Sequence, residues 1–251
     1  MSKVAIIGCG ILGASIAYEL SKVKGLEITL IEQDAPASGS TGAALGVLMG
    51  IISHKTKSRA WRLREASIKR YQTLLPELEA KTKITIPTNH QGIVKLLFTG
   101  DRLDKWKTLQ QIRQSQGWQL EIWDKAYLQQ QCPDVIHKDI IAAVYSPQDR
   151  QINPSILTQA LVAGAKQNGV NCQFGLKVEK FIAKSSGNTN LQTCSRLQIN
   201  DREVAIDWLI ISAGLNSTPL TRVLQQAVDI RPVLGQALKL KLPYDFGKED
   251  F

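Results

Sequence analysis

Three glycines near the start of the chain have the spacing needed to hold a phosphate. Gly8, Gly10 and Gly13 follow the apolar run Val4–Ile7 and precede a segment with apolar residues at helical spacing. The first glycine permits a tight turn after a buried strand, the second lets backbone approach a pyrophosphate, and the third lets the helix pack closely on the sheet. The helix would direct its first N–H groups and its positive dipole end at the phosphates. The pattern predicts a strand–turn–helix unit that binds a dinucleotide.

A carboxylate stands where such a unit needs one. The segment "LEITLIEQD" is typical of a second strand and ends on Glu32, nineteen residues after Gly13. A carboxylate at that strand tip can accept hydrogen bonds from both hydroxyls of an adenosine ribose. No Arg or Lys follows directly, where a ribose 2′-phosphate would need one. The pattern therefore favours an unphosphorylated adenosine dinucleotide over the alternative of a glycine-rich turn with a solvent-facing glutamate.

The loop after the second strand indicates which dinucleotide. A nicotinamide-binding unit would enter another crossover helix, whereas residues 35–50 here read "APASGSTGAALGVLMG". Small residues let backbone come close to a large flat ligand, and Ser40 and Thr41 can donate to phosphate or ribityl oxygens. The alternative is an ordinary flexible loop, although its apolar half, 43–52, would then be left in water. The loop favours a flavin.

The chain of 251 residues can bury one large core or two modest ones, and its net charge is +9. The basic residues are spread along the whole sequence. The densest segment, 54–70, is typical of the solvated face of an amphipathic helix rather than of a polyanion site. We expect no nucleic-acid partner. The candidate inward residues of this helix are apolar or aromatic: Trp61, Leu63, Ile68 and Tyr71.

Cysteine usage indicates a reducing compartment. The four cysteines form no C-x-x-C pair and have no histidine at ligand spacing, which predicts no metal site. No apolar run is long enough to cross a bilayer, and Ser2 and Lys3 lead into the glycine motif rather than into a signal-peptide core. We therefore expect a cytoplasmic protein without a transmembrane segment. The cysteines are Cys9, Cys132, Cys172 and Cys194.

The middle of the chain predicts a second layer of architecture. Helical patterns near 101–117 and 125–131 alternate with strand patterns, which indicates a mixed, partly antiparallel insertion. A helix is expected over 154–169, and the buried run 207–217 should return to the first sheet beside the glycine turn. The expected strands of the insertion and of the following pair are 92–98, 140–147, 172–184 and 191–200.

Taken in order, these pieces resemble the FAD-dependent amino-acid oxidase family, which includes glycine oxidase, D-amino-acid oxidase, sarcosine oxidase and their dehydrogenase relatives. The matching segments are "IIGCGILGASIAYEL", the acid Glu32, "GSTGAALGVL", "DRQINPSILTQAL" (149–161), "WLIISAGLNS" and "RPVLGQALKL" (231–240). The resemblance implies an α/β fold with a Rossmann-like FAD-binding domain, 1–85 and 149–225. It also implies a mixed-sheet α+β substrate domain, 86–148 and 226–251, incomplete at the C-terminus.

The resemblance also implies which residues contact FAD. The glycine turn would surround the pyrophosphate, the acid would hold the ribose, the small-residue loop would line the phosphates, ribityl chain and isoalloxazine edge, and the late turn would cross over the dinucleotide. One strand residue, Val178, would meet the adenine through its backbone, although it equally fits an ordinary strand position. The implied set is Gly8, Gly10, Ile11, Leu12, Gly13, Glu32, Gln33, Ser40, Thr41, Ala44, Gly46, Val47, Val178, Ser212, Ala213 and Gly214.

The implied activity is oxidation of a small amine or amino acid by hydride transfer to flavin N5. Family members continue past the point where this sequence ends, and the further segment supplies the arginine that holds the substrate carboxylate. No residue of 1–251 is therefore named as catalytic, and His54, a tempting base, fits a structural role better. Two alternatives stay open: an FAD-binding remnant without turnover, and a basic RNA-associated scaffold. A homo-oligomer or a complementing C-terminal segment is a further expectation, while the substrate and electron acceptor stay open.

Overall fold

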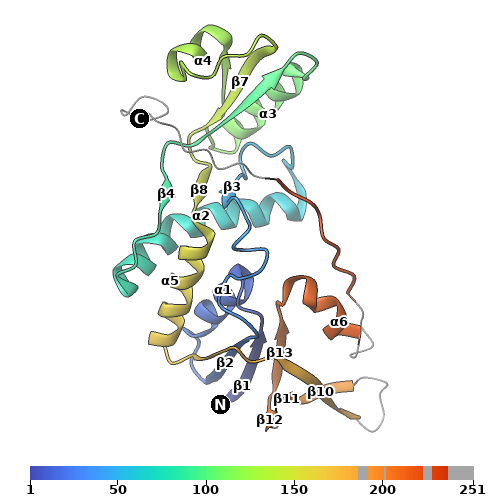
Figure 1. The fold of residues 1–251 in the computed structure, drawn as a ribbon. Helices are drawn as coiled ribbons and strands as arrows, with labels where there is room; N and C mark the ends of the chain where they lie inside the picture. Colours follow the sequence, from blue (N-terminus) through green and yellow to red (C-terminus); the bar gives the residue numbers. More distant parts are fainter. Residues whose placement is uncertain (186–191, 201, 223–227, 237–251) are drawn as a thin grey trace. The chain divides into compact units, whose positions relative to one another are not determined.

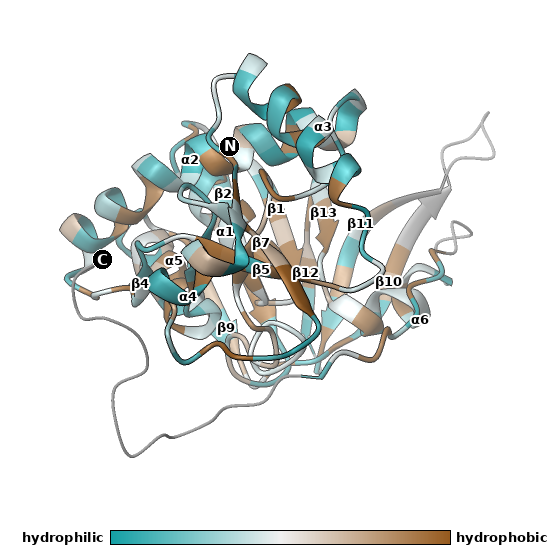
Figure 2. Ribbon diagram, turned by 90° about the horizontal axis from the view of Figure 1, so that it is seen from above, coloured by the Kyte–Doolittle hydropathy of each residue, from teal (hydrophilic) through white to brown (hydrophobic). Residues whose placement is uncertain are grey.

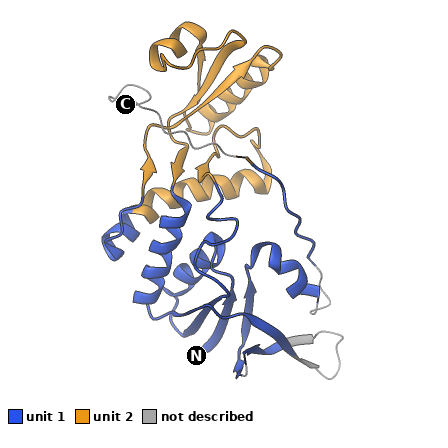
Figure 3. Ribbon diagram, viewed as in Figure 1, with its two compact units in different colours: residues 1–44, 76–86, 153–235 blue, residues 45–75, 87–152, 236–251 orange. Residues whose placement is uncertain are grey.

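The structure, a computed structural model, describes residues 1–185, 192–200, 202–222 and 228–236 (Figure 1). The chain divides into two compact units (Figure 3). Unit 1 contains residues 1–44, 76–86 and 153–235, and unit 2 contains residues 45–75, 87–152 and 236–251.

A parallel four-stranded sheet organises unit 1, in the order β13-β1-β2-β9. Helix α1 packs against α5, and a Cβ added to Gly164 of α5 would lie 2.7 Å from the ring of Tyr18 on α1. The side chain of Asn153 caps α5 by accepting a hydrogen bond from the N–H of Ile156. The bounds are β1 Ser2–Ile7, β2 Leu26–Glu32, β9 Asn171–Phe174, β13 Trp208–Ile211, α1 Ile11–Leu20 and α5 Pro154–Gln167.

An antiparallel sheet, β10-β11-β12, completes unit 1. Its apolar residues Phe181 and Leu197 share one buried cluster with Ala5, Ile7 and Ile31 of the parallel sheet. The bounds are β10 Val178–Ser185, β11 Gln192–Ile199 and β12 Arg202–Ala205, followed after β13 by the short helices η1 Gly214–Asn216 and α6 Ser217–Arg222.

The prediction of one strand over 172–184 is wrong, because the chain leaves the parallel sheet at Phe174 and enters the antiparallel sheet at Val178. Gly175 between them has φ +73°, a conformation that favours glycine and breaks the strand. Its N–H donates to the carbonyl of Asp34, so the break is tied to the segment after β2.

Unit 2 contains two small sheets, β3-β8-β4 and β5-β7-β6, whose strand pairs are all antiparallel. Figure 2 shows mostly hydrophilic colouring along α3, in contrast to the hydrophobic strands β1 and β13 of unit 1. The bounds are β3 Val47–Leu48, β4 Thr88–Asn89, β5 Ile93–Phe98, β6 Glu121–Asp124, β7 Ile140–Ser146, β8 Arg150–Ile152, α3 Leu103–Ser115 and α4 Lys125–Gln131.

The long helix α2, Ser58–Thr82, contributes its residues up to 75 to unit 2. Trp61 and Ile68 are buried there with Leu109 of α3, as the amphipathic pattern predicts. Leu63 is 61% exposed, so its prediction as an inward residue is wrong. Position 63 lies two residues after Trp61, which places it about 200° around the helix and away from the buried stripe.

The units divide the chain at different residues from the predicted domains. Segment 45–75, which the resemblance places in the FAD-binding domain, is grouped with unit 2. The expected sheet-entering segment 231–240 has no helix or strand over 231–236, and its remainder lies outside the described residues. No helix in the described part of the chain has both the length and the apolar character of a membrane span.

Candidate functional site

Pairing of β1 with β13 brings the first strand of unit 1 beside its last strand. Ile7 is in register with Ile211, and the next residue, Ser212, donates its backbone N–H to the carbonyl of Ile7 at 2.8 Å. The hydroxyl of Ser212 lies 3.0 Å from the carbonyl oxygens of both Ile7 and Gly8. The structure therefore confirms the expectation that the late Ile-Ser-Ala-Gly segment returns beside the glycine turn.

Two of the three glycines are required by packing. Gly8 has φ +98°, and a Cβ there would lie 2.5 Å from the carbonyl oxygen of Ser212. A Cβ on Gly13 would lie 2.6 Å from the Ser212 hydroxyl. Gly10 differs, because the atom nearest to a Cβ added there would be the hydroxyl oxygen of Thr41, at 3.0 Å. The fold explains the first and third glycines, whereas a ligand at this turn would best explain the second.

The N-terminus of α1 retains the features of an anion site. Gly10 is the N-cap and offers no side-chain hydrogen bond, and no acidic residue lies in the first turn. The N–H of Ile11 donates to the hydroxyl of Thr41 at 3.0 Å, and the side chain of Leu12 is 69% exposed. Because no acidic residue of the first turn offsets the helix dipole, a phosphate would be stabilised at this end.

Glu32 at the tip of β2 joins two turns. Its Oε2 accepts the N–H of Cys9 at 2.7 Å, and its Oε1 accepts the N–H of Asp34 at 3.1 Å. A carboxylate has about four acceptor positions, so two remain for ribose hydroxyls. The neighbouring Gln33 is exposed, and its amide donates to the carboxylate of Asp34 at 3.1 Å. The acid therefore has a structural role in addition to the one implied by the resemblance.

Cys9, inside the glycine turn, is chemically quiet. Burial raises the pKa of its thiol to about 12, and the neighbouring Cys172 and Glu32 act in the same direction. The thiolate is the reactive form of cysteine, so this residue is neutral and inert at neutral pH.

Most of the other predicted residues lie in unit 1. Ser40 and Ala44 are exposed in unit 1, and Ala213 is half-buried before Gly214, which has φ +56° and starts η1. Val178 is buried in the core of unit 1, so its side chain has the ordinary strand role, and its backbone contact with adenine stays a prediction.

Gly46 and Val47 belong to unit 2. The carbonyl of Gly46 accepts the N–H of Ile152 at 3.0 Å, and Val47 on β3 pairs with Gln151 on β8. His54 also lies in unit 2, where its ring packs on Trp106 with centroids 4.3 Å apart. That packing agrees with a structural role for His54. Among the described residues, no three His, Cys, Asp or Glu side chains gather as a metal site.

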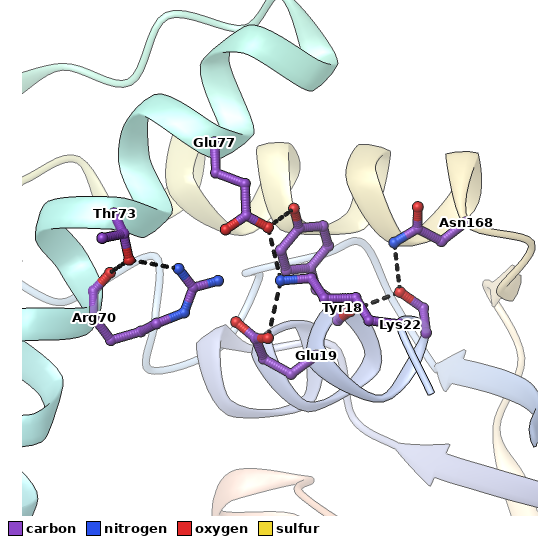
Figure 4. Close-up of polar contacts among 8 residues, drawn as sticks. Tyr18, Glu19, Lys22, Arg70, Thr73, Glu77 and Asn168 are labelled. Carbon is purple, nitrogen blue, oxygen red and sulfur yellow. Dashed lines mark hydrogen bonds and ion pairs between the residues drawn. The ribbon is translucent and has the colours of Figure 1, made fainter. Parts of the chain in front are cut away.

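A polar network holds the far end of α1 (Figure 4). The hydroxyl of Tyr18 donates to Glu77 at 2.6 Å, and the ammonium of Lys22 contacts the carboxylates of Glu77 and Glu19 at 2.7 and 2.9 Å. Asn168, after α5, donates to the hydroxyl of Ser21 at 2.8 Å. These contacts fix the C-terminal end of the helix whose N-terminus forms the candidate phosphate site.

Sequence reasoning missed two buried charged residues of unit 2 that shape the segment after the small-residue loop. The carboxylate of Asp149 accepts the N–H groups of Gly50, Ile51 and Ile52 at 2.8, 3.0 and 2.9 Å. From α3, Arg113 donates to the carbonyls of Ile51 at 2.7 Å and Ser53 at 2.6 Å. The only sequence signal was the place of Asp149 at the start of the "DRQINP" segment.

Comparison with known proteins identifies this arrangement. A family model described as FAD dependent oxidoreductase matches residues 3–250. The chain belongs to this FAD-dependent oxidoreductase family. Mitochondrial dimethylglycine dehydrogenase of Homo sapiens is 29% identical over 199 residues, which cover 76% of this chain and 21% of that protein. Glycine oxidase of Geobacillus kaustophilus is 25% identical over 240 residues, which cover 96% of this chain and 62% of that protein.

The solved structures agree on the fold of this oxidoreductase. The crystal structure of glycine oxidase from Geobacillus kaustophilus superposes with a TM-score of 0.75 at 24% identity, over 88% of this chain and 58% of that chain. The fold class expected from sequence is therefore confirmed as that of this flavoprotein family. The chain spans less than two thirds of the length of these relatives, from 21% to 62%.

Proposed function

We propose that this chain is the cofactor-binding part of an FAD-dependent oxidoreductase that acts on a small amine or amino acid. The observation that carries the proposal is the crossing of Gly8 and Ser212 at the open N-terminus of α1. With Glu32 at the tip of the adjacent strand, this crossing provides an anion site and a ribose acceptor on one sheet edge.

The residues present fit FAD. The N–H groups at the start of α1 and the bare backbone of Gly10 would hold the pyrophosphate, and Glu32 with Gln33 would hold the adenosine ribose. Ser40, Thr41 and Ala44 would line the phosphates and the ribityl chain, while Ser212, Ala213 and Gly214 would cross over the dinucleotide, and all six residues lie in unit 1. When bound, FAD would supply a hydride acceptor for the oxidation of the carbon next to the substrate nitrogen. The chain's own residues would bind and orient the cofactor and the substrate, and they would exclude water from the site.

The substrate class follows from the family and from the names of the relatives. One relative is named for dimethylglycine and another for glycine, so a small amine or amino acid is the class that we propose for this protein. A cytoplasmic location is supported by four cysteines that are all free thiols.

The test is FAD uptake by the purified chain. We expect yellow protein with flavin absorbance, and we expect Gly10→Val to abolish retention because an isopropyl group would occupy the pyrophosphate position. Gly10 has an extended backbone, φ −75° and ψ −176°, which valine adopts readily, so the variant should keep its thermal unfolding midpoint.

Glycine, sarcosine and D-amino acids are then added, and bleaching of the flavin and release of hydrogen peroxide are followed. Bound FAD that no amine reduces would indicate a flavin-binding chain without turnover of its own. A folded protein that takes up no added FAD would contradict the proposal.

A further inference from the structure

Unit 2 contains a recess, which we call the Trp106 pocket. Its volume is about 550 Å³, which is within the range of small-molecule sites. It is built wholly from unit 2 and therefore does not rest on the proposed FAD site. Its walls come from the segment before α2, from β5, from the turn that leads into α3 and from the first turn of α3: His54, Lys95, Gly100, Asp101, Arg102, Lys105 and Trp106.

Aromatic rings form one wall of the Trp106 pocket. Trp106 is only 6% exposed, and the ring of His54 lies against it at 4.3 Å with an interplanar angle of 54°. The ammonium of Lys95 lies 5.4 Å from the indole centroid, within the range of a cation–π contact. The exposed ring of His54, which covers Trp106, is the surface that an apolar or aromatic group could contact while its charged end stays near Lys95.

Positive charge exceeds negative charge among the lining residues, where Lys95, Arg102 and Lys105 stand beside one carboxylate, Asp101. Arg102 is paired with Asp104 at 2.9 and 2.6 Å, and the carboxylate of Asp101 accepts the N–H of Phe98 at 2.8 Å. In the described part of the chain, neither Lys95 nor Lys105 forms an ion pair.

The positive charges of Lys95 and Lys105 both affect the pKa of His54. Burial lowers the pKa of its imidazole first, and the charges of Lys95, Lys105 and Arg113 lower it further. Both lysines are exposed at the rim of the recess, where an anion could interact with both ammonium groups.

We propose that the Trp106 pocket binds a phosphomonoester dianion. A phosphomonoester carries a charge of about −1.5 to −2 at neutral pH, which matches the two unpaired lysines. Lys95 and Lys105 contact the phosphoryl oxygens, and the organic part of the ester lies on the rings of Trp106 and His54.

The probe is phenyl phosphate, titrated into the full chain and followed by the NMR signals of the Trp106 indole and the His54 imidazole. We expect saturable shifts of both signals, and a weaker response to inorganic phosphate, which lacks the ring. Lys95→Ala and Lys105→Ala should each weaken binding by about tenfold, as expected for loss of one hydrogen bond to a charged group. Lys107→Ala, an exposed lysine of α3 outside the pocket, should leave the affinity unchanged.

Three outcomes would overturn the proposal. The first is no shift at either ring with millimolar phenyl phosphate. The second is binding that both lysine variants leave intact, with their thermal unfolding midpoints equal to wild type. The third is tighter binding of an RNA oligonucleotide that displaces phenyl phosphate and weakens steeply with salt, which would assign the pocket to a nucleic-acid backbone.

Discussion

The carbonyl oxygen of Gly8 lies 1.9 Å from the position that a Cβ on Gly13 would occupy. The first turn of α1 therefore rests directly on the backbone of the turn that precedes it. No flexible side chain stands between them, so the contact cannot relax by a rotamer change. This close approach sets the angle at which α1 leaves the sheet, and with it the direction of the helix N-terminus.

The effect of Gly13→Ala follows from this contact. The added methyl group must displace backbone, so we expect a loss of about 1–3 kcal/mol in the free energy of unfolding. Gly10→Ala is the matched control, because its Cβ would meet only the Thr41 hydroxyl at 3.0 Å. Urea denaturation of both variants measures the difference. Equal stabilities for the two proteins would contradict the packing described for α1.

Glu32→Gln should lower both stability and FAD affinity. The amide can accept the N–H of Cys9 or that of Asp34 through its oxygen, but its NH₂ group then opposes the other donor. We expect a cost of about 1–3 kcal/mol in the free energy of unfolding. Glu27→Gln, an exposed position on the same strand, serves as control. If Glu32→Gln unfolds at the same urea concentration as wild type, the carboxylate does not hold the two turns.

Asp149→Asn tests the buried contact that sequence reasoning missed. The residue is fully buried, and its Oδ1 serves Gly50 and Ile51 while its Oδ2 serves Ile52. An asparagine amide keeps one oxygen, so at least one of these N–H groups would face another donor, at a cost of about 2 kcal/mol. Asp139→Asn, at an exposed position, should change the unfolding midpoint little. Equal midpoints for both variants would show that segment 50–52 does not depend on the carboxylate.

Arg113 binds the same segment as Asp149. Its positive charge stabilises the negative charge of the buried aspartate. Burial lowers the pKa of the Arg113 guanidinium to about 10, while the charge of Asp149 raises it, so the arginine remains charged at neutral pH. Its guanidinium also lies 3.6 Å from the ring centroid of Trp61. Asp149 thus holds the segment after the small-residue loop through its N–H groups, and Arg113 holds it through its carbonyls.

Local patterns allowed much of unit 1 to be predicted. The apolar run before Gly8, the acid at position 32 and the apolar strand that ends at Ile211 each carry their signal within a few residues, and the carboxyl ends of parallel strands meet at one edge of a sheet. The prediction that the run 207–217 is buried is wrong, because Trp208 is 65% exposed and the rest of β13 is half-buried. The break at Gly175 was not predicted, because strand alternation continues on both sides of it. Nor were Arg113 and Asp149, whose partners lie 62 and 99 residues away along the chain. Such contacts arise only when separate elements pack, and no spacing in the sequence encodes them.

The ionisation of His54 gives a test of the charges around the Trp106 pocket. Because burial and then Lys95, Lys105 and Arg113 lower its pKa below the ordinary value of 6.5, the folded protein binds a proton there less readily than the unfolded chain. Folding stability should therefore decrease as pH falls below about 6.5 toward the lowered value. Lys105→Ala removes one of the positive charges and should raise the pKa of His54, measured from its imidazole NMR signals, whereas Lys107→Ala should not. A pKa of His54 that is the same in Lys105→Ala as in wild type would show that the lysine charge does not reach the imidazole.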